Sequence, residues 1–159
     1  MKFNSALKNF VLVLFSTLLI SACSTAKKAS VDTTDDVYTG TDTVEYLANG
    51  VPDRVFFATN KSSLTTRSRD TLRKQATYLR KNKDVTITVE GHADERGTRE
   101  YNLALGERRA NAAKDYLMTY GVSGKRISVI SYGKEKPVNP ASSPLAWSQN
   151  RRSVTIKAN

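Results

Sequence analysis

The chain has little of several residue types, and each scarcity excludes a class of protein. Cysteine occurs once, at Cys23, so no disulfide can form within the chain. Histidine also occurs once, at His92, which excludes the usual zinc sites built from several histidines and cysteines. No internal repeat is evident, which excludes repeat architectures. No apolar run reaches the roughly 20 residues that a membrane-spanning helix needs.

The longest apolar run lies near the N-terminus, from Phe10 to Ile20, and follows Lys2 and Lys8. It has about 11 residues, the length of the hydrophobic region of a signal peptide. Small residues come directly before Cys23, as in a lipobox. We therefore predict a lipoprotein signal peptide over residues 1–22 and lipidation of Cys23. An ordinary secretory signal with an incidental cysteine is the alternative.

Basic residues outnumber acidic ones by 25 to 15 in the whole chain. Removal of residues 1–22 leaves a side-chain charge of +8, because that segment holds two lysines and no acid. Such a charge favours nucleic acid, anionic lipid or an acidic polymer as partner. The predicted export argues against nucleic acid, so we expect an anionic component of the cell envelope.

The chain divides into three parts. After the signal peptide, residues 23–50 are rich in Ser, Thr, Asp and Lys, and they predict a lipidated N-terminus followed by a flexible tether. A short ordered element at Val44–Leu47 is the alternative for part of this segment. Residues 51–159 are long enough for one globular domain.

Alternating and helical patterns predict four strands and two helices in this domain. Strands are expected at 54–58, 85–89, 127–132 and 153–157, and helices at 67–82 and 99–120. Thr98 is suited to cap the second helix and Gly121 to end it, and the later prolines indicate a loop before the last strand. The order βαβαββ predicts an α/β fold of the α+β sandwich type, with a four-stranded mixed sheet and both helices on one face.

One stretch, Val89 to Ala110, carries the most chemical information: VEGHADERGTREYNLALGERRA. A short strand runs into a polar turn that holds Asp94, and Arg109 follows fifteen residues later in the next helix. If both line one cleft, they suit a zwitterionic ligand, with its ammonium at Asp94 and its carboxylate at Arg109. On spacing alone, a structural salt bridge between the two is equally expected.

The same stretch, together with SYGKEKP at 131–137 and NRR at 150–152, resembles the peptidoglycan-associated lipoproteins of the OmpA-like domain family. The three motifs occur in order between about residues 54 and 156. The resemblance implies that Asp94 and Arg109 hold the diaminopimelate of the peptidoglycan stem peptide. Diaminopimelate has the carboxylates and the ammonium that these two side chains complement.

Four further residues match positions that line the ligand cleft in this family. The resemblance implies that Asn102 and Leu105 line the cleft, and that backbone amides at Thr59 and Asn60 meet the ligand. Many members have an FD-x-D-K arrangement where this chain has FATNK, at 57–61. A backbone contact at Asn60 survives that difference, whereas a carboxylate contact does not.

The resemblance also implies a function without catalysis or cofactor. Lipid on Cys23 would hold the outer membrane, on its periplasmic face, and the domain would grip peptidoglycan noncovalently. The protein would belong to the Tol-Pal system, which acts in envelope integrity and in outer-membrane constriction at division. Its partner there would be a periplasmic TolB-like β-propeller.

Two other functions are left open by the sequence. One is an OmpA-like lipoprotein accessory of another envelope machine, and the other is a lipoprotein peptidoglycan hydrolase. His92 beside Asp94 invites the catalytic interpretation, but we interpret it as a strand-end residue that holds the turn by hydrogen bonds. Trp147 and the NRR segment are expected to serve core packing and helix-end bonding, with Arg151 at the rim of the cleft.

Overall fold

The computed structural model describes residues 31–32 and 36–158. Its main sheet has four strands in the order β5 (Arg54–Phe56), β8 (Arg152–Lys157), β6 (Ile87–His92) and β7 (Ile127–Gly133). The strands β6 and β7 are parallel, whereas β8 runs antiparallel to both of its neighbours. The predicted mixed four-stranded sheet is therefore confirmed.

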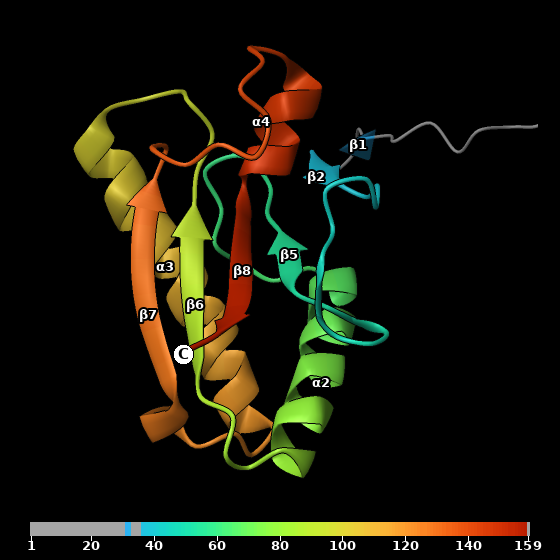
Figure 1. The fold of residues 1–159 in the computed structure, drawn as a ribbon. Coiled ribbons are helices and arrows are strands. Elements are labelled where there is room, and N and C mark those ends of the chain that lie inside the picture. The colour runs from blue at the N-terminus through green and yellow to red at the C-terminus, as the bar shows by residue number, and fades with distance from the viewer. Residues whose placement is uncertain (1–30, 33–35, 159) are drawn as a thin grey trace, which may run out of the picture.

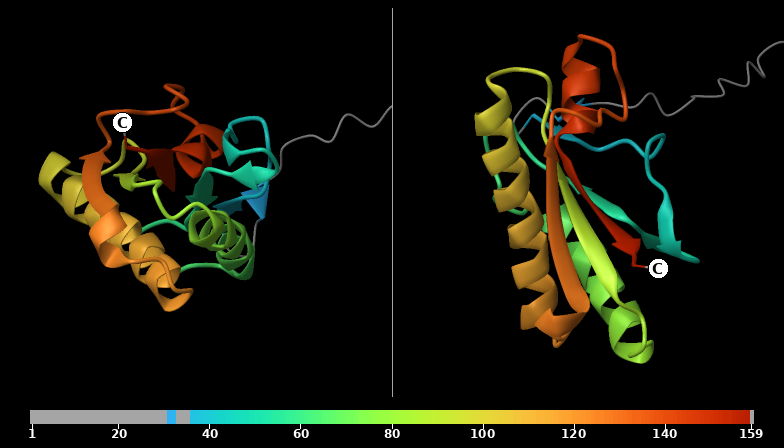
Figure 2. Two further views of the ribbon diagram at one scale, coloured as in Figure 1. Left: turned by 60° about the horizontal axis from the view of Figure 1, so that its bottom comes forward. Right: turned by 60° about the vertical axis from the view of Figure 1, so that its left-hand side comes forward.

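Two long helices, α2 (Thr66–Lys81) and α3 (Arg99–Thr119), lie on the same side of the sheet (Figures 1 and 2). The apolar core fills the space between them and the strands, and Val89, Leu79 and Leu117 are fully buried there. Each helix begins after a threonine whose side chain accepts a backbone N–H of the first turn, Thr65 for α2 and Thr98 for α3. The Thr98 cap was predicted, whereas α2 begins one residue earlier than predicted. No helix within the described ranges is long and apolar enough to cross a membrane.

Close contact between α3 and β6 depends on two glycines. A Cβ atom built on Gly106 would lie 2.9 Å from the carbonyl oxygen of Gly91, which is too close for any real side chain. The absence of a side chain at Gly106 thus lets the helix backbone approach the strand. This close approach sets the distance between α3 and the end of β6, where the polar turn begins.

A third helix, α4 (Pro144–Asn150), lies where the sequence indicated only a loop. The Ser143 side chain accepts the Ala146 N–H at 3.2 Å, and Pro144 takes the first helical position, where its missing N–H costs nothing. A single turn of 3-10 helix, Gly124–Arg126, precedes β7. The prediction of only two helices was therefore wrong, because the domain also contains this short third helix.

Residues 36–50 also differ from the tether predicted over 23–50. They contain β2 (Val37–Tyr38), which pairs with β1 (Val31–Asp32), and β3 (Tyr46–Ala48), which pairs with β4 (Val51–Pro52). The Tyr38 ring is fully buried and meets the Phe56 ring edge-on at 4.8 Å. Apolar burial thus binds this segment to the domain. The predicted signal peptide and Cys23 lie outside the described residues.

Candidate functional site

The polar residues of interest gather at one end of the sheet. At this end of the sheet, the C-terminal ends of β6 and β7 lie beside the start of β8, and α4 lies over them (Figure 1). The loop after β5 and the turn after β6 reach the same end (Figure 1). Side chains that are far apart in the sequence therefore come together at this edge.

Asp94 comes two residues after the end of β6 and is 7% exposed. Arg96 holds both of its carboxylate oxygens, from Nε at 3.1 Å and from Nη2 at 2.7 Å, and its backbone N–H donates as well. Arg151 Nη1 donates from the other side at 3.3 Å. Burial raises the pKa of Asp94, but these hydrogen bonds outweigh it and hold the pKa below its ordinary value.

Arg109 is fully buried on the face of α3 that points to the sheet. Its guanidinium donates to three backbone carbonyls: Nε to Lys61 at 2.9 Å, Nη1 to His92 at 2.8 Å, and Nη2 to Ala58 at 3.1 Å. Arg109 therefore clamps the loop after β5 to the end of β6. Three of its five N–H groups are used in this way, which leaves one on each terminal nitrogen.

No ion pair joins Asp94 to Arg109 in the part of the chain that the structure describes, so the salt bridge that spacing alone allowed is not formed. The Arg109 pKa is lowered to about 9, first by burial and then by the charge of Arg151, while the charge of Asp94 opposes this. The guanidinium is still protonated at pH 7. The site therefore contains a buried cation whose charge no carboxylate neutralises by direct contact within the described ranges.

Asn102 and Leu105 lie on the same face of α3 as Arg109 and are 2% and 3% exposed. The Asn102 amide donates to the carbonyl oxygen of Arg96 at 2.8 Å. It therefore holds the turn that carries Asp94 and Arg96. Leu105 is buried about one turn of helix before Arg109.

Thr59 and Asn60 lie in the loop after β5, as the sequence predicts. Thr59 is half-buried, accepts a hydrogen bond from Arg96 Nη2 at 3.2 Å, and donates its hydroxyl to Asp36. Asn60 is exposed and has a φ of 55°, in the left-handed region that Asn tolerates better than most residues. Backbone geometry thus gives a reason for Asn at this position.

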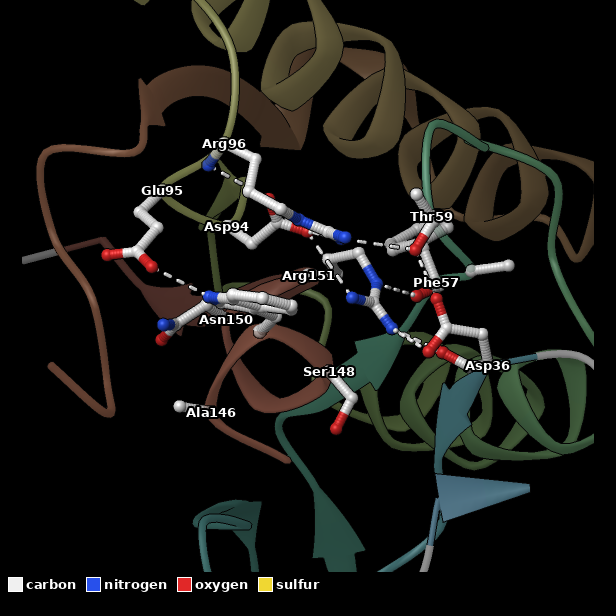
Figure 3. A network of polar contacts seen from close by, with 12 residues as sticks. Asp36, Phe57, Thr59, Asp94, Glu95, Arg96, Ala146, Ser148, Asn150 and Arg151 are labelled. Carbon is white, nitrogen blue, oxygen red and sulfur yellow. Dashed lines mark hydrogen bonds and ion pairs between the residues drawn. The ribbon is translucent and has the colours of Figure 1, made fainter. Parts of the chain in front are cut away.

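Three further side chains, Arg96, Arg151 and Asp36, complete a closed network with Asp94 and Thr59, and Figure 3 shows Arg151 between the two acidic residues. The sequence predicted Arg151 at the rim of the cleft, but it singled out neither Arg96 nor Asp36. Arg151 is 1% exposed, and its Nη2 lies 2.9 Å from Asp36 Oδ1. Arg96 lies in the same motif as Asp94, so its role could have been predicted from the sequence. Nothing in the sequence around Asp36 indicates that it belongs to the site.

Trp147 lies at the rim of this network, half-buried. The Arg96 guanidinium stacks on its ring, 4.4 Å from the centroid, and its indole N–H donates to Glu95 at 2.8 Å. The prediction of core packing for Trp147 was therefore wrong, since its ring packs on the turn that carries Asp94. Trp147 keeps the Arg96 side chain extended over the site surface.

His92 is 1% exposed, and its Nε2 lies 3.3 Å from a carboxylate oxygen of Glu90. Burial, followed by the charges of Arg152 and Lys136, lowers the His92 pKa to about 3. The ring is therefore neutral at pH 7 and shielded from solvent. The ring contacts Glu90 of the same strand and not the turn, and its Nδ1 has no hydrogen-bond partner among the described residues. It is the backbone carbonyl of His92 that links this strand end to the site, by accepting from Arg109. Within the described ranges no group of three or more His, Cys, Asp or Glu side chains could hold a metal ion.

Comparison with known proteins gives the family. The model of the OmpA family matches residues 56–151, which include the loop after β5, Asp94, Arg109 and Arg151. The chain belongs to the OmpA family. This OmpA-family region contains most of the polar network, whereas Asp36 lies before it.

Several relatives of this OmpA-family chain have the name peptidoglycan-associated lipoprotein. The one from Rhizobium meliloti (strain 1021) is 57% identical over 106 residues, and the match covers 67% of this chain and 60% of that protein. The chain thus matches about three fifths of that relative's length. The one from Brucella melitensis is 42% identical over 150 residues, which cover 91% of this chain and 89% of that protein.

Solved structures agree with the OmpA-family fold. The peptidoglycan-associated lipoprotein from Burkholderia pseudomallei is 37% identical, with a TM-score of 0.65 over 67% of this chain and 90% of that one. The C-terminal domain of Helicobacter pylori MotB is 24% identical, with a TM-score of 0.63 over 67% of this chain and 84% of that one. The second likeness shows the fold alone.

Proposed function

We propose that this protein is an outer-membrane lipoprotein whose OmpA-family domain binds peptidoglycan noncovalently and tethers the membrane to the cell wall. Relatives that match most of the chain are named for an association with peptidoglycan, which supports this proposal. The ligand group is the diaminopimelate of the stem peptide. The protein acts by binding and not by catalysis, which agrees with a lone histidine that is buried and shielded from substrate.

The observation that carries the proposal is the buried Arg109 guanidinium. A buried cation is costly unless a carboxylate and hydrogen bonds compensate it. Arg109 has its hydrogen bonds to carbonyls and two N–H groups to spare, but no direct carboxylate partner within the described residues. A ligand carboxylate would supply the missing charge in a planar, two-point contact.

Asp94 supplies the opposite half of the recognition. Its carboxylate is ionised at neutral pH, since its pKa lies below the ordinary value. An ammonium group that approaches Asp94 has to replace one of the arginines now bound to it. Arg151 is buried, whereas the Arg96 side chain is 42% exposed and can turn into solvent once its contacts with Asp94 are broken. The ligand ammonium therefore takes the place of Arg96.

The other predicted site residues shape the cleft around these two charges. Asn102 fixes the turn after β6 through the Arg96 carbonyl, and Leu105 gives an apolar wall. Thr59 and Asn60 offer backbone amides to the ligand from the opposite loop. The Asn60 side chain is not required for this contact.

In the envelope, lipid on Cys23 anchors the protein at the periplasmic face of the outer membrane. A periplasmic TolB-like β-propeller of the Tol-Pal system binds a surface that overlaps the wall-binding face. Exclusion between the two ligands makes the anchor releasable during outer-membrane constriction. This context is supported by the resemblance of the chain to the peptidoglycan-associated lipoproteins.

The test is co-sedimentation of the full chain, in mild detergent, with purified sacculi. Asp94→Asn removes the proposed ammonium contact and is expected to weaken binding more than tenfold, because losing a buried charge partner costs about 2–5 kcal/mol. Asp115→Asn makes the same charge change on the exposed side of α3 and should bind like the wild type. Circular dichroism verifies that both variants are folded. A wild-type protein that stays in the supernatant would refute the proposal.

A further inference from the structure

The side chain of Arg151 stands between two carboxylates from distant parts of the chain. It lies 2.9 Å from Asp36 and 3.3 Å from Asp94, and its Nη2 also donates to the backbone carbonyl of Asp36. Its Nε donates to the carbonyl oxygen of Phe57 at 3.1 Å, so the guanidinium is held in place. Because Arg151 is 1% exposed, water screens its charge only weakly, and the two acids share it.

We propose that Asp36 is a specificity-determining residue of the ligand site. Asp36 neutralises the charge of Arg151. The negative charge of Asp94 is then available to bind the ammonium group of a zwitterionic ligand. Asp36 touches no ligand in this scheme and acts through Arg151. The inference rests on the function proposed above, since it concerns the same site.

The charges around the site explain why this carboxylate matters. When Arg96 swings outward, two acidic side chains, Asp36 and Asp94, and two basic ones, Arg109 and Arg151, are left at the centre of the site. A zwitterion is itself neutral and fits such a balanced set. Without the charge of Asp36 the set has an excess positive charge, which repels an ammonium and favours a ligand that offers only a carboxylate.

The local backbone explains how a residue outside the matched family region enters the site. The loop at 57–61 holds no acidic residue, so it offers Arg151 no carboxylate of its own. Thr59 donates its hydroxyl to Asp36 and thereby fixes the carboxylate at this loop. Asp36 has a φ of 53°, a left-handed conformation that Asp tolerates, and this conformation brings both its carbonyl and its side chain to Arg151.

The test compares two kinds of sacculi with the full-length protein in mild detergent. One kind is native, and the other has its free amino groups acetylated, so that it keeps the carboxylates and lacks the ammonium groups. Asp36→Asn removes the charge and retains an oxygen, and its side-chain position is 46% exposed, so the domain should fold. Asp42→Asn is the matched control, because Asp42 is also an acid of the N-terminal segment with one hydrogen bond, to Gln149.

We expect Asp36→Asn to weaken binding to native sacculi by about fivefold to tenfold, as for a partly exposed member of a buried charge pair. Binding to acetylated sacculi should fall less, so the preference for native over acetylated sacculi shrinks. Asp42→Asn should keep the wild-type preference. Asp36→Glu, which retains the carboxylate, should also keep it.

The outcomes separate this inference from the proposed function. If the wild type binds neither kind of sacculi, the proposed function is wrong and the inference falls with it. If the wild type binds native sacculi and Asp36→Asn binds equally well, only the inference is wrong. An equal loss on both kinds of sacculi, or a loss of preference in Asp36→Glu, would likewise contradict a role in selecting the ammonium group.

Discussion

Replacement of Arg96 by Ala is expected to tighten the binding of sacculi, because Arg96 occupies the carboxylate that we propose for the ligand ammonium. Its guanidinium makes two hydrogen bonds to Asp94, one to Thr59, and a stacking contact with Trp147. The ligand has to break the contacts with Asp94 before it can bind. In Arg96→Ala that cost disappears, while the backbone N–H at this position still donates to Asp94.

The magnitude follows from the exposure of the side chain. Arg96 is 42% exposed, so solvent screens its ion pair with Asp94, and such pairs are worth about 0.2–1 kcal/mol. Relief of about 1 kcal/mol in the unbound protein corresponds to roughly fivefold tighter binding. The same change removes the stacking on Trp147 and one bridge to the loop after β5. The free energy of unfolding should therefore fall by about 1 kcal/mol.

For Arg96→Ala we thus expect tighter binding together with a lower free energy of unfolding, and two measurements test this combination. Affinity is measured by co-sedimentation over a range of sacculus concentrations, and stability by urea unfolding followed by circular dichroism. Arg99→Ala is the matched control, since Arg99 pairs with Glu135 at 3.3 Å and is 64% exposed. Weaker binding by Arg96→Ala than by Arg99→Ala would show that Arg96 holds the ligand, and the proposed displacement would be wrong.

Two further predictions concern the scaffold of the site. His92 has a pKa of about 3 in the folded protein, so between pH 6.5 and 3 the unfolded chain binds more protons and stability falls as the pH falls, by up to about 1.4 kcal/mol per unit. The loss between pH 6 and 4 should be smaller in His92→Gln, and equal losses in urea unfolding would contradict this. Gly106→Ala should lower stability by about 1–3 kcal/mol, because its Cβ meets the Gly91 backbone. Gly124→Ala, which meets only the flexible Met118 side chain, should melt nearly as the wild type does in calorimetry.

The elements that local patterns encode were predictable. The strand β6 alternates and α3 has a cap, a periodic buried face and a terminal glycine, all of which the sequence contains. Even there, the buried face of α3 includes Asn102 and Arg109, which no apolar pattern would place inside. The pattern departs from apolar residues where the helix lines the polar end of the sheet. Such departures are typical of functional sites.

The parts that were not predicted depend on contacts between distant residues. The prolines after β7 indicate a loop, whereas Ser143 caps a helix in which Pro144 is the first residue. Asp36 and Arg151 lie 115 residues apart, and neither has a neighbour in the sequence that suggests the other. Residues 36–50 are polar enough to predict a tether, but the burial of Tyr38 ties them to the domain. Composition alone cannot show that one aromatic ring has a place to pack.

The three arginines of the site differ in burial, and burial decides what each can do. Arg109 is fully buried and held by three carbonyls, so moving it would expose carbonyls and disturb two loops. Arg151 is equally buried but stands between two acids, so its charge is compensated and its position fixed. Only Arg96 is exposed and leaves its partner at a cost of about 1 kcal/mol. On the proposed binding mode, a ligand that exchanges its ammonium for Arg96 enters a site in which Arg109 and Arg151 keep their present hydrogen bonds and charge partners.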